Sequence, residues 1–509
     1  MSSSSFVYTL PLKVSRKEEK VLNKRFDAAR QLYNACLGES LRRLDLMRQA
    51  KTYQYARKCK KKKERNDLFR EARQDASFSE YDLHKFVTEI KNKCGIKKHI
   101  DSNSAQKLAT RAFDAVAKYS YKQRGRPRFK GKGRLRSLEG KSNAAGIRFK
   151  DGKIHWSGLN LDLCYDKKDK HGVETHALLH RTKYVRLVKK TIRFKPVFYV
   201  QLIQEGTPKQ KEKNTVGNDK VGLDIGPSTI AMVSSKQAFL SAFCAELKLI
   251  QKQIAQTQRL LDRSKRATNK DNFNENGTIK KGRRQWRFSN RYHKNKAKAA
   301  ELQRKTQETR KKLHGQMAND ILRFGREINT EKLSYLSFQK NYGKSVGNRA
   351  PGKFIEILSQ KAERAGGKVV HFSTYKTKLS QACHGCGVYV KKSLSKRWHD
   401  CSCGVGPVQR DLYSAYLAQF VVNDCLDKSQ AEKAWTGAEP LLRHALSRLD
   451  QSASGKLRLS SFGLSKPQRQ SASHVEEGST SIDTVDVVRF EKSIPESHRE
   501  LPDIALRTP

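Results

Sequence analysis

Four cysteines in a short stretch place the strongest constraint on how this chain can fold. Cys383 and Cys386 are separated by two residues, Cys401 and Cys403 by one, and fourteen residues lie between the two pairs. In a reducing compartment this spacing predicts a metal site before disulfides, because four thiolates can close a tetrahedral zinc site. A segment of about twenty residues with few apolar side chains needs the ion to fold. We therefore predict a structural zinc ribbon.

The second cysteine pair is one residue tighter than the usual spacing of two, so His384 or His399 could replace one thiolate. The other six cysteines are scattered along the chain and are expected to be packed or inert: Cys36, Cys59, Cys94, Cys164, Cys244 and Cys425.

The charge of the chain predicts a polyanionic partner. Its 509 residues include 105 Lys and Arg against 50 Asp and Glu, a formal net charge of +55. Self-repulsion on this scale opposes a compact state unless an anion compensates it, and the composition favours nucleic acid over a membrane surface. No window approaches the run of about 18 apolar residues that a membrane span needs, and residues 1–13 lack the features of a secretory signal. We expect a cytoplasmic protein with no membrane partner.

Two basic segments are candidates for holding nucleic-acid backbones. Every second residue from Lys122 to Arg136 is basic, and in an extended chain alternate side chains share one face that could follow phosphates. A solvated Gly/Pro-rich loop is the alternative. A second run lies at residues 57–63. The predicted binding residues are Arg124, Arg126, Arg128, Lys130, Lys132 and Arg134, with Lys60, Lys61, Lys62 and Lys63.

A third basic region covers residues 263–312, with eighteen Lys and Arg against four Asp and Glu. Trp286, Phe288 and Tyr292 are interleaved with these cations. Cations can hold phosphates while aromatic faces stack bases, which favours a nucleic-acid surface. A solvated helical face with core aromatics is the alternative.

The local patterns predict several domains. A strand at residues 6–10 precedes a helix that opens on the capping box Ser15-x-x-Glu18, and residues 15–121 are expected to be mainly helical. Strands at 146–149, 184–188 and 197–203, together with the first strand, suggest a small antiparallel barrel. Two apolar strands follow at 221–226 and 230–233, and then a helix from about Gln237.

The end of the chain has a different character. Residues 451–509 contain eight Lys and Arg and eight Asp and Glu, and they lack the apolar mass to fold alone. A mostly disordered tail is expected, with a docked strand at residues 485–490 as the alternative.

Three carboxylates occupy positions where a charge does not serve stability. Asp224 ends a buried-looking strand, Glu331 ends a short strand, and Asp411 begins an apolar helical stretch. Each has an ordinary explanation alone: a turn residue, a surface residue or a helix cap. Together they offer the oxygen ligands that Mg²⁺ or Mn²⁺ prefers, and two such ions can clamp the attacking and leaving oxygens of a phosphodiester. The spacing alone does not establish that they meet.

At these residues the sequence resembles the TnpB family of transposon-encoded RNA-guided nucleases and, by extension, the related small type V CRISPR effectors. The resemblance rests on the order of seven short motifs together with the ribbon. The motifs are Gly125–Lys130, Phe198–Val200, Gly222–Gly226, Arg310-x3-His314, Glu331–Leu333, Leu379–Gly387 and Arg410–Ala415.

The resemblance implies a multidomain α+β architecture. An OB-like wedge β-barrel (1–14 and 121–215) would hold an inserted helical recognition domain (15–120). An RNase H-like RuvC nuclease domain (216–370 and 404–430) would be interrupted by the zinc ribbon (371–403), and residues 431–509 would form a mostly disordered tail.

The resemblance also implies an activity. Asp224, Glu331 and Asp411 would be catalytic ligands of Mg²⁺ or Mn²⁺, and the four cysteines would hold zinc. A guide RNA would direct the protein to double-stranded DNA beside a short adjacent motif, in a prokaryotic, nucleoid-associated setting. The oligomeric state stays open.

Three departures from the family pattern leave two alternative functions open. Gln409 stands where the family has an Asp, Tyr413 and Ser414 replace Asn and Ala, and one extra residue precedes Asp411. An RNA-guided DNA-binding protein with weak or no cleavage is one alternative. A strand-transferring transposase is the other, although the ribbon between the second and third carboxylates argues against it.

Overall fold

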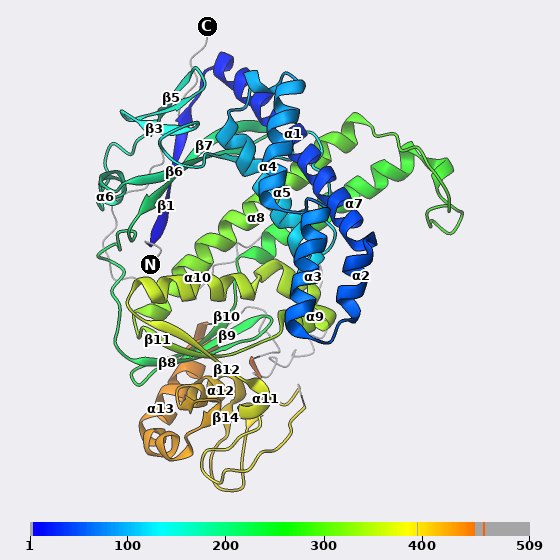
Figure 1. Cartoon of the computed structure of the whole chain (residues 1–509). Helices are drawn as coiled ribbons and strands as arrows, with labels where there is room; N and C mark the ends of the chain where they lie inside the picture. The colour runs from blue at the N-terminus through cyan, green and yellow to red at the C-terminus, as the bar shows by residue number, and fades with distance from the viewer. Residues whose placement is uncertain (1–3, 394, 453–461, 464–509) are drawn as a thin grey trace. The chain divides into compact units, whose positions relative to one another are not determined.

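The computed structural model describes residues 4–393, 395–452 and 462–463. The chain divides into two compact units, residues 1–214 and 215–509 (Figure 1). This division falls next to the expected boundary between residues 215 and 216. In the described part of the chain, no helix has the length and apolar character needed to cross a membrane.

The first unit combines a helical part with an antiparallel sheet. Its helices are α1 (Arg16–Gln49), α2 (Lys51–Lys58), α3 (Lys62–Asp75), α4 (Glu80–Lys93), η1 (Ile96–Lys98), α5 (Ser102–Ser120) and α6 (Val173–Leu179). Its strands are β1 (Ser5–Lys13), β2 (Ser137–Glu139), β3 (Arg148–Lys150), β4 (Lys153–Trp156), β5 (Leu159–Leu163), β6 (Thr182–Ile192) and β7 (Lys195–Glu205). The mainly helical character expected for residues 15–121 is confirmed.

The predicted capping box at the start of α1 is present. Ser15 Oγ accepts from Glu18 N at 3.3 Å, and the Glu18 carboxylate accepts from Ser15 N at 2.8 Å, so two free donors of the first turn are satisfied. Apolar residues at helical spacing then turn one face of α1 inward, with Leu22, Phe26 and Leu37 in the core of this unit.

The seven strands of the first unit pair antiparallel in the order β2-β6-β7-β1-β5-β4-β3. The strand at the N-terminus lies at the centre, between β7 and β5. The strands predicted at residues 6–10, 184–188 and 197–203 are confirmed, and β6 and β7 are longer than expected. The strand predicted at 146–149 begins only at Arg148. Because this order has two end strands, closure into an OB-like barrel stays a prediction.

The second unit is built around a mixed five-stranded sheet. Its strands are β8 (Lys220–Ile225), β9 (Thr229–Val233), β10 (Ala238–Ala242), β11 (Glu327–Glu331), β12 (Lys368–Phe372), β13 (Trp398–His399), β14 (Val408–Gln409), β15 (Val421–Val422) and β16 (Cys425–Leu426). Its helices are α7 (Leu247–Thr268), η2 (Lys270–Asn272), α8 (Asn290–Leu322), α9 (Tyr335–Arg349), α10 (Pro351–Arg364), α11 (Thr374–Thr377), α12 (Arg410–Ala418) and α13 (Lys428–Ser452).

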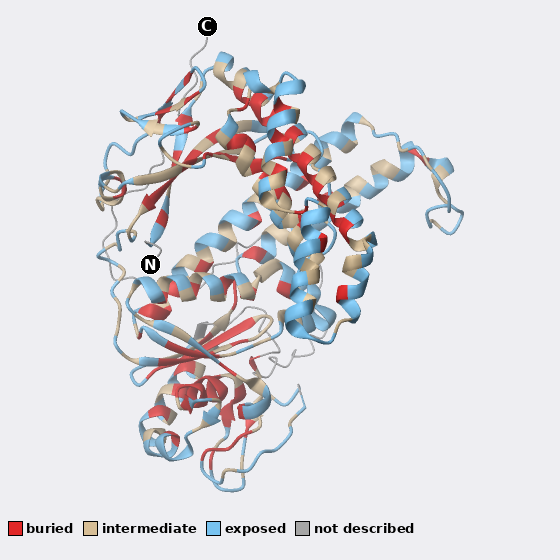
Figure 2. Cartoon of the chain, in the orientation of Figure 1, coloured by how far each residue is buried: buried red, intermediate tan, exposed pale blue. Residues whose placement is uncertain are grey.

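The large sheet has the order β10-β9-β8-β11-β12, with β8, β11 and β12 parallel and the β8-β9-β10 meander antiparallel. Residues of α8 and α10 pack on one face, and residues of α12 and α13 pack on the other. Figure 2 shows the buried residues gathered along the central strands and through α12. The central strands are therefore apolar on both faces, as expected for a sheet covered on both sides.

The helix expected from about Gln237 is wrong at its start. Residues 238–242 form β10, which pairs with β9, and α7 begins only at Leu247. Phe239 and Leu240 pack into opposite cores, one on each face of the sheet. Neighbouring side chains that point to opposite faces of a sheet are typical of a strand. The prediction failed because the four-residue spacing of Phe239 and Phe243 also fits a helix.

The disordered tail expected from residue 431 is wrong for residues 431–452, which lie in α13. Ala431, Ala438, Leu442 and Ala445 recur at helical spacing and are buried against the α12 side of the sheet. The alternative strand at residues 485–490 lies outside the described residues.

Candidate metal centre and nucleic-acid interface

Asp224 and Glu331 belong to adjacent parallel strands at the same sheet edge. In the β8–β11 ladder, Gly222 pairs with Asn329 and Leu223 with Thr330. The next residues in this register are Asp224 and Glu331, which lie close enough for the Glu331 charge to raise the pKa of Asp224. Both lie at the carboxyl ends of their strands, where the crevices of open α/β sheets bind ligands.

Asp411 reaches the same edge from α12. The alternation along β8 turns Gly222 and Asp224 toward α12, because Val221 and Leu223 pack into the core on the opposite face. A Cβ on Gly222 would lie 1.9 Å from Ala415 O, so only glycine lets the helix approach this closely. Asn329 Nδ2 donates to Ala418 O at 3.0 Å and to Val421 O at 3.1 Å, which holds the end of α12 on β11.

The electrostatics of the three carboxylates show that they share one environment. Burial raises the pKa of Asp224 well above its usual range, and the nearby Asp411 and Glu331 raise this pKa further. Burial raises the pKa of Glu331 to about 7 and also raises the pKa of Asp411, against the lowering effect of Arg410. Mutual repulsion of this kind is relieved by a bound cation, so the donor set fits a divalent metal with oxygen ligands.

Several neighbours of the carboxylates were not among the residues predicted from the sequence. Thr229 Oγ1 donates to Asp411 Oδ2 at 3.3 Å, and Arg410 Nε lies 3.8 Å from Asp411 Oδ1. Tyr335, at the start of α9, lies close enough for the Asp224 charge to raise its pKa, after the larger effect of burial. The position of Tyr335, four residues after Glu331, could have pointed to it.

The Arg310-x3-His314 motif holds the end of α9. Arg310 Nη1 donates to Asn348 O at 2.9 Å, and His314 Nε2 lies 2.8 Å from Arg349 O. The His314 ring stacks on Phe243 at 5.6 Å between centroids. These contacts give the motif a role in packing α8 against the α9–α10 connection.

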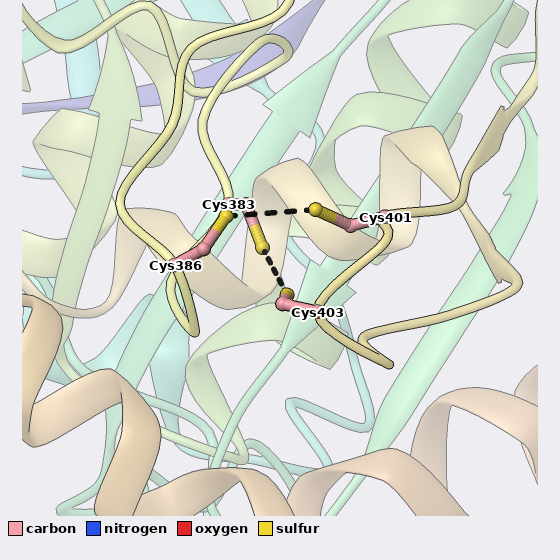
Figure 3. A group of neighbouring side chains, drawn as sticks. All are labelled: Cys383, Cys386, Cys401 and Cys403. Carbon is pink, nitrogen blue, oxygen red and sulfur yellow. Dashed lines mark hydrogen bonds between the residues drawn. The ribbon is translucent and has the colours of Figure 1, made fainter.

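The four cysteines come together in the second unit (Figure 3), with Cys383 buried and Cys386 and Cys403 exposed. Cys383 Sγ lies 3.5 Å from Cys403 Sγ, and Cys386 Sγ lies 3.5 Å from Cys401 Sγ. Tetrahedral zinc with bonds of about 2.3 Å separates its sulfur ligands by about 3.8 Å, whereas a disulfide bond measures about 2.0 Å. The four sulfur atoms therefore fit a closed zinc site.

The four sulfur atoms all lie within 4.8 Å of one another. Each cysteine pair sits on a tight turn in which a glycine, Gly387 or Gly404, takes a positive φ.

The two histidines considered as substitute ligands stand outside this group. His384 Nδ1 lies 2.8 Å from Tyr413 Oη, and the His399 ring stacks on Tyr413 at 4.2 Å between centroids. Tyr413, one of the departures from the family pattern, thus packs between them. Gln409, another departure, caps α12 by accepting from Leu412 N at 2.8 Å.

The basic strip at residues 122–136 is not one extended segment. Lys122 takes a positive φ at the end of α5, and Arg134 N donates to Gly131 O at 3.0 Å in a turn. Lys130 is docked on α1, where Asn34 Oδ1 accepts from Lys130 N and Asn34 Nδ2 donates to Lys130 O. The side chains nevertheless stay accessible: Arg124, Arg126, Arg128, Lys132 and Arg134 are exposed. The expectation of a single line of cations is therefore wrong, while their role in binding stays a prediction.

The run Lys60–Lys63 forms the exposed tip of the α2–α3 hairpin. A longer hairpin, α7 with α8, carries the third basic region and extends away from the sheet (Figure 1). At its tip, Lys265 Nζ lies 3.8 Å from the centre of the Trp286 ring, and Phe288 stacks on Tyr292 at 4.3 Å. Trp286 is thus covered by a cation, while Phe288 remains 39% exposed and available for stacking.

Comparisons with known proteins agree with part of this picture. Residues 352–417 match the family model described as Cas12f1-like, TNB domain, and this segment contains the four cysteines and Asp411. A comparison with curated proteins finds no match.

Two solved structures match this chain in a structural comparison. A Cas12f1–sgRNA–target DNA complex matches at 14% identity, with a TM-score of 0.42, over 81% of this chain and 98% of that chain. A CRISPR–Cas12f ternary complex matches at 13% identity, with a TM-score of 0.27, over 79% of this chain and 81% of that chain.

Proposed function

We propose that the protein is an RNA-guided, metal-dependent DNA endonuclease of the TnpB type, associated with a transposable element. The observation that carries this proposal is the meeting of Asp224, Glu331 and Asp411 at one sheet edge, from three segments that are distant in the sequence. The motif order and the family match over residues 352–417 support it.

Asp224, Glu331 and Asp411 would hold two Mg²⁺ or Mn²⁺ ions. Such ions polarise a phosphodiester and stabilise the charge that develops on the attacking and leaving oxygens. The residues around the carboxylates keep them in place. Thr229 fixes one oxygen of Asp411, and Arg410 balances its charge until a cation binds.

The nucleic acids would be a guide RNA and double-stranded target DNA, cut beside a short adjacent motif. The net charge of +55 supports a polyanionic partner, and exposed cations are available on the 124–134 segment and the α2–α3 tip. The four cysteines would bind zinc in a structural role, because all four ligand positions are filled by protein.

Guide-directed cleavage of a plasmid tests the proposal. The protein, expressed with its flanking DNA so that any guide is copied, should cut a matched plasmid in Mg²⁺, and Asp224→Ala should lower the rate at least about a thousandfold. Asp219→Ala, a change to an aspartate outside the site, should cut normally. Undiminished cleavage by Asp224→Ala would show that the site is assigned wrongly.

The same assay separates the alternatives. Guide-dependent DNA binding without any cut would favour the binding protein with a decayed site. Joined DNA ends in place of open cuts would favour a strand-transferring transposase.

A further inference from the structure

The helix that carries Asp411 begins directly after a strand that pairs with the zinc ribbon. β13 pairs with β14, with Trp398 opposite Gln409, and α12 starts at the next residue. Gln409 thus belongs to the ribbon through its backbone and caps the helix through its side chain. The position of Asp411 is therefore set by the ribbon and by the sheet together.

Arg410 adds a second connection between the ribbon and the helix. Its backbone N donates to Arg397 O at 2.9 Å, and its Nη1 donates to Lys396 O at 3.0 Å and to Ser393 O at 3.2 Å. The guanidinium held by these carbonyls faces the Asp411 carboxylate, and the two side chains are only 11% and 13% exposed.

Tyr413 makes the connection that reaches the cysteines. Its hydroxyl accepts from His384 N at 3.0 Å and shares a hydrogen bond of 2.8 Å with His384 Nδ1. Since the oxygen already accepts from the backbone N–H, its own proton can go to Nδ1. His384 directly follows Cys383, so this buried hydroxyl ties the first cysteine turn to α12 two residues after Asp411.

We propose that Tyr413 is a positioning residue through which occupancy of the four-cysteine site controls how well Asp411 is placed to bind a divalent cation. With zinc bound, the first cysteine turn is fixed, His384 is fixed with it, and the Tyr413 hydroxyl holds the start of α12. Without zinc the turn opens and this hold is lost. The cation part of the proposal rests on the proposed function, whereas the ordering of α12 does not.

The chain provides a matched control in Tyr416. This residue lies one turn further along α12, is equally buried, and donates its hydroxyl to Ala431 O of α13 rather than to the ribbon. Tyr413→Phe and Tyr416→Phe each remove one buried hydroxyl and keep the ring. A general loss of stability would affect both variants alike.

Hydrogen exchange on the full-length, zinc-loaded chain tests the coupling without nucleic acid. The amides of His384, Arg410 and Leu412 report directly, because each donates to a group at the junction. Removing zinc from the wild type with a chelator should lower their protection about tenfold, and Tyr413→Phe should lower it similarly with zinc still bound. Tyr416→Phe should match the wild type in both states.

Mn²⁺ binding, followed by the loss of the free-ion EPR signal, gives the second readout. Chelating zinc from the wild type or from Tyr416→Phe should weaken Mn²⁺ binding about tenfold, whereas chelating it from Tyr413→Phe should change little further. If zinc removal and Tyr413→Phe weaken Mn²⁺ binding less together than the sum of their separate effects, Tyr413 is the residue that connects the four-cysteine site to Asp411.

The proposal would be overturned if zinc removal and Tyr413→Phe weakened Mn²⁺ binding additively. It would also be overturned if the three amides were as well protected from exchange in Tyr413→Phe as in Tyr416→Phe. If the wild type bound no Mn²⁺ at all, the proposed function would fail. The exchange measurement would still decide whether the ribbon orders α12.

Discussion

Gly222 in β8 lies directly beneath Ala415 in α12, and a Cβ on the glycine would come within 1.9 Å of the alanine carbonyl oxygen. This contact brings the helix that bears Asp411 onto the strand that bears Asp224. No rotamer can relieve such a clash, because a Cβ has no torsion of its own and the opposing atom is backbone.

Gly222→Ala should therefore push α12 away from the sheet and destabilise the protein by more than about 3 kcal/mol. Thermal unfolding should show the loss, and Mg²⁺ should no longer raise the midpoint. Gly315→Ala is the control, since a Cβ at that helical glycine meets open space and should be neutral or stabilising. A Gly222→Ala protein with wild-type stability would contradict the close packing.

Replacing one of the four cysteines proposed to bind zinc should remove the ion. Cys403→Ser should lower the bound zinc from about one ion per chain to none at neutral pH, since three thiolates no longer close the site. Elemental analysis of the dialysed protein measures this, and limited proteolysis should then cut between residues 383 and 403. Cys425→Ser, at an exposed cysteine outside the cluster, should keep its zinc. A full zinc equivalent in Cys403→Ser would show that another residue completes the site.

The carboxylate site predicts a pH dependence of stability. Burial raises the folded-state pKa of Glu331 to about 7, above the value of about 4.3 in an unfolded chain. The folded form therefore holds its proton more tightly, so the metal-free protein should lose stability as the pH rises from about 4.5 through about 7. Mg²⁺ bound at the proposed site would compete with that proton, so its stabilising effect should grow over the same range. Melting curves at several pH values, with and without Mg²⁺, measure both trends.

Asp224→Asn sharpens this test. Burial, and then the nearby Asp411 and Glu331, raise the pKa of Asp224, so the wild type loses stability as the pH rises toward neutral. The uncharged amide avoids this cost, so the metal-free variant should melt at a higher temperature than the wild type near neutral pH. Mg²⁺ should add nothing to it. A variant that is less stable than the wild type without metal would show that burial of the Asp224 carboxylate beside Asp411 and Glu331 does not cost stability.

The α2–α3 tip should hold phosphates. Replacing Lys60, Lys61, Lys62 and Lys63 with Ala should reduce the slope of log affinity against log salt for RNA by about 3, because each lost phosphate contact removes about 0.7 to 0.9. Fluorescence anisotropy over a salt series measures the slope. The control replaces Lys167, Lys168 and Lys170, which lie in a loop that also contains Asp166 and Asp169. An unchanged slope for the Lys60–Lys63 variant would remove this tip from the interface.

The sequence was sufficient for features that depend on local spacing. The four cysteines are brought together as their spacing indicates, and β8, β9 and α1 follow from their apolar patterns. It could not show that Asp224 stands beside Glu331, because that depends on the register between strands far apart in the chain. The tyrosine at 413 looked like a departure from a motif, and only the three-dimensional contact with His384 gives it a role.

The order of the segments along the chain has a consequence for synthesis. A nascent polypeptide that has emerged as far as Glu331 carries two of the three carboxylates and none of the four cysteines. Asp411 follows the ribbon and sits on a helix that the ribbon helps to start, so the third ligand takes its place only after both cysteine turns have left the ribosome. The proposed cutting centre would thus be completed only after the ribbon has been translated, and a truncated product lacking residue 411 should be harmless to DNA.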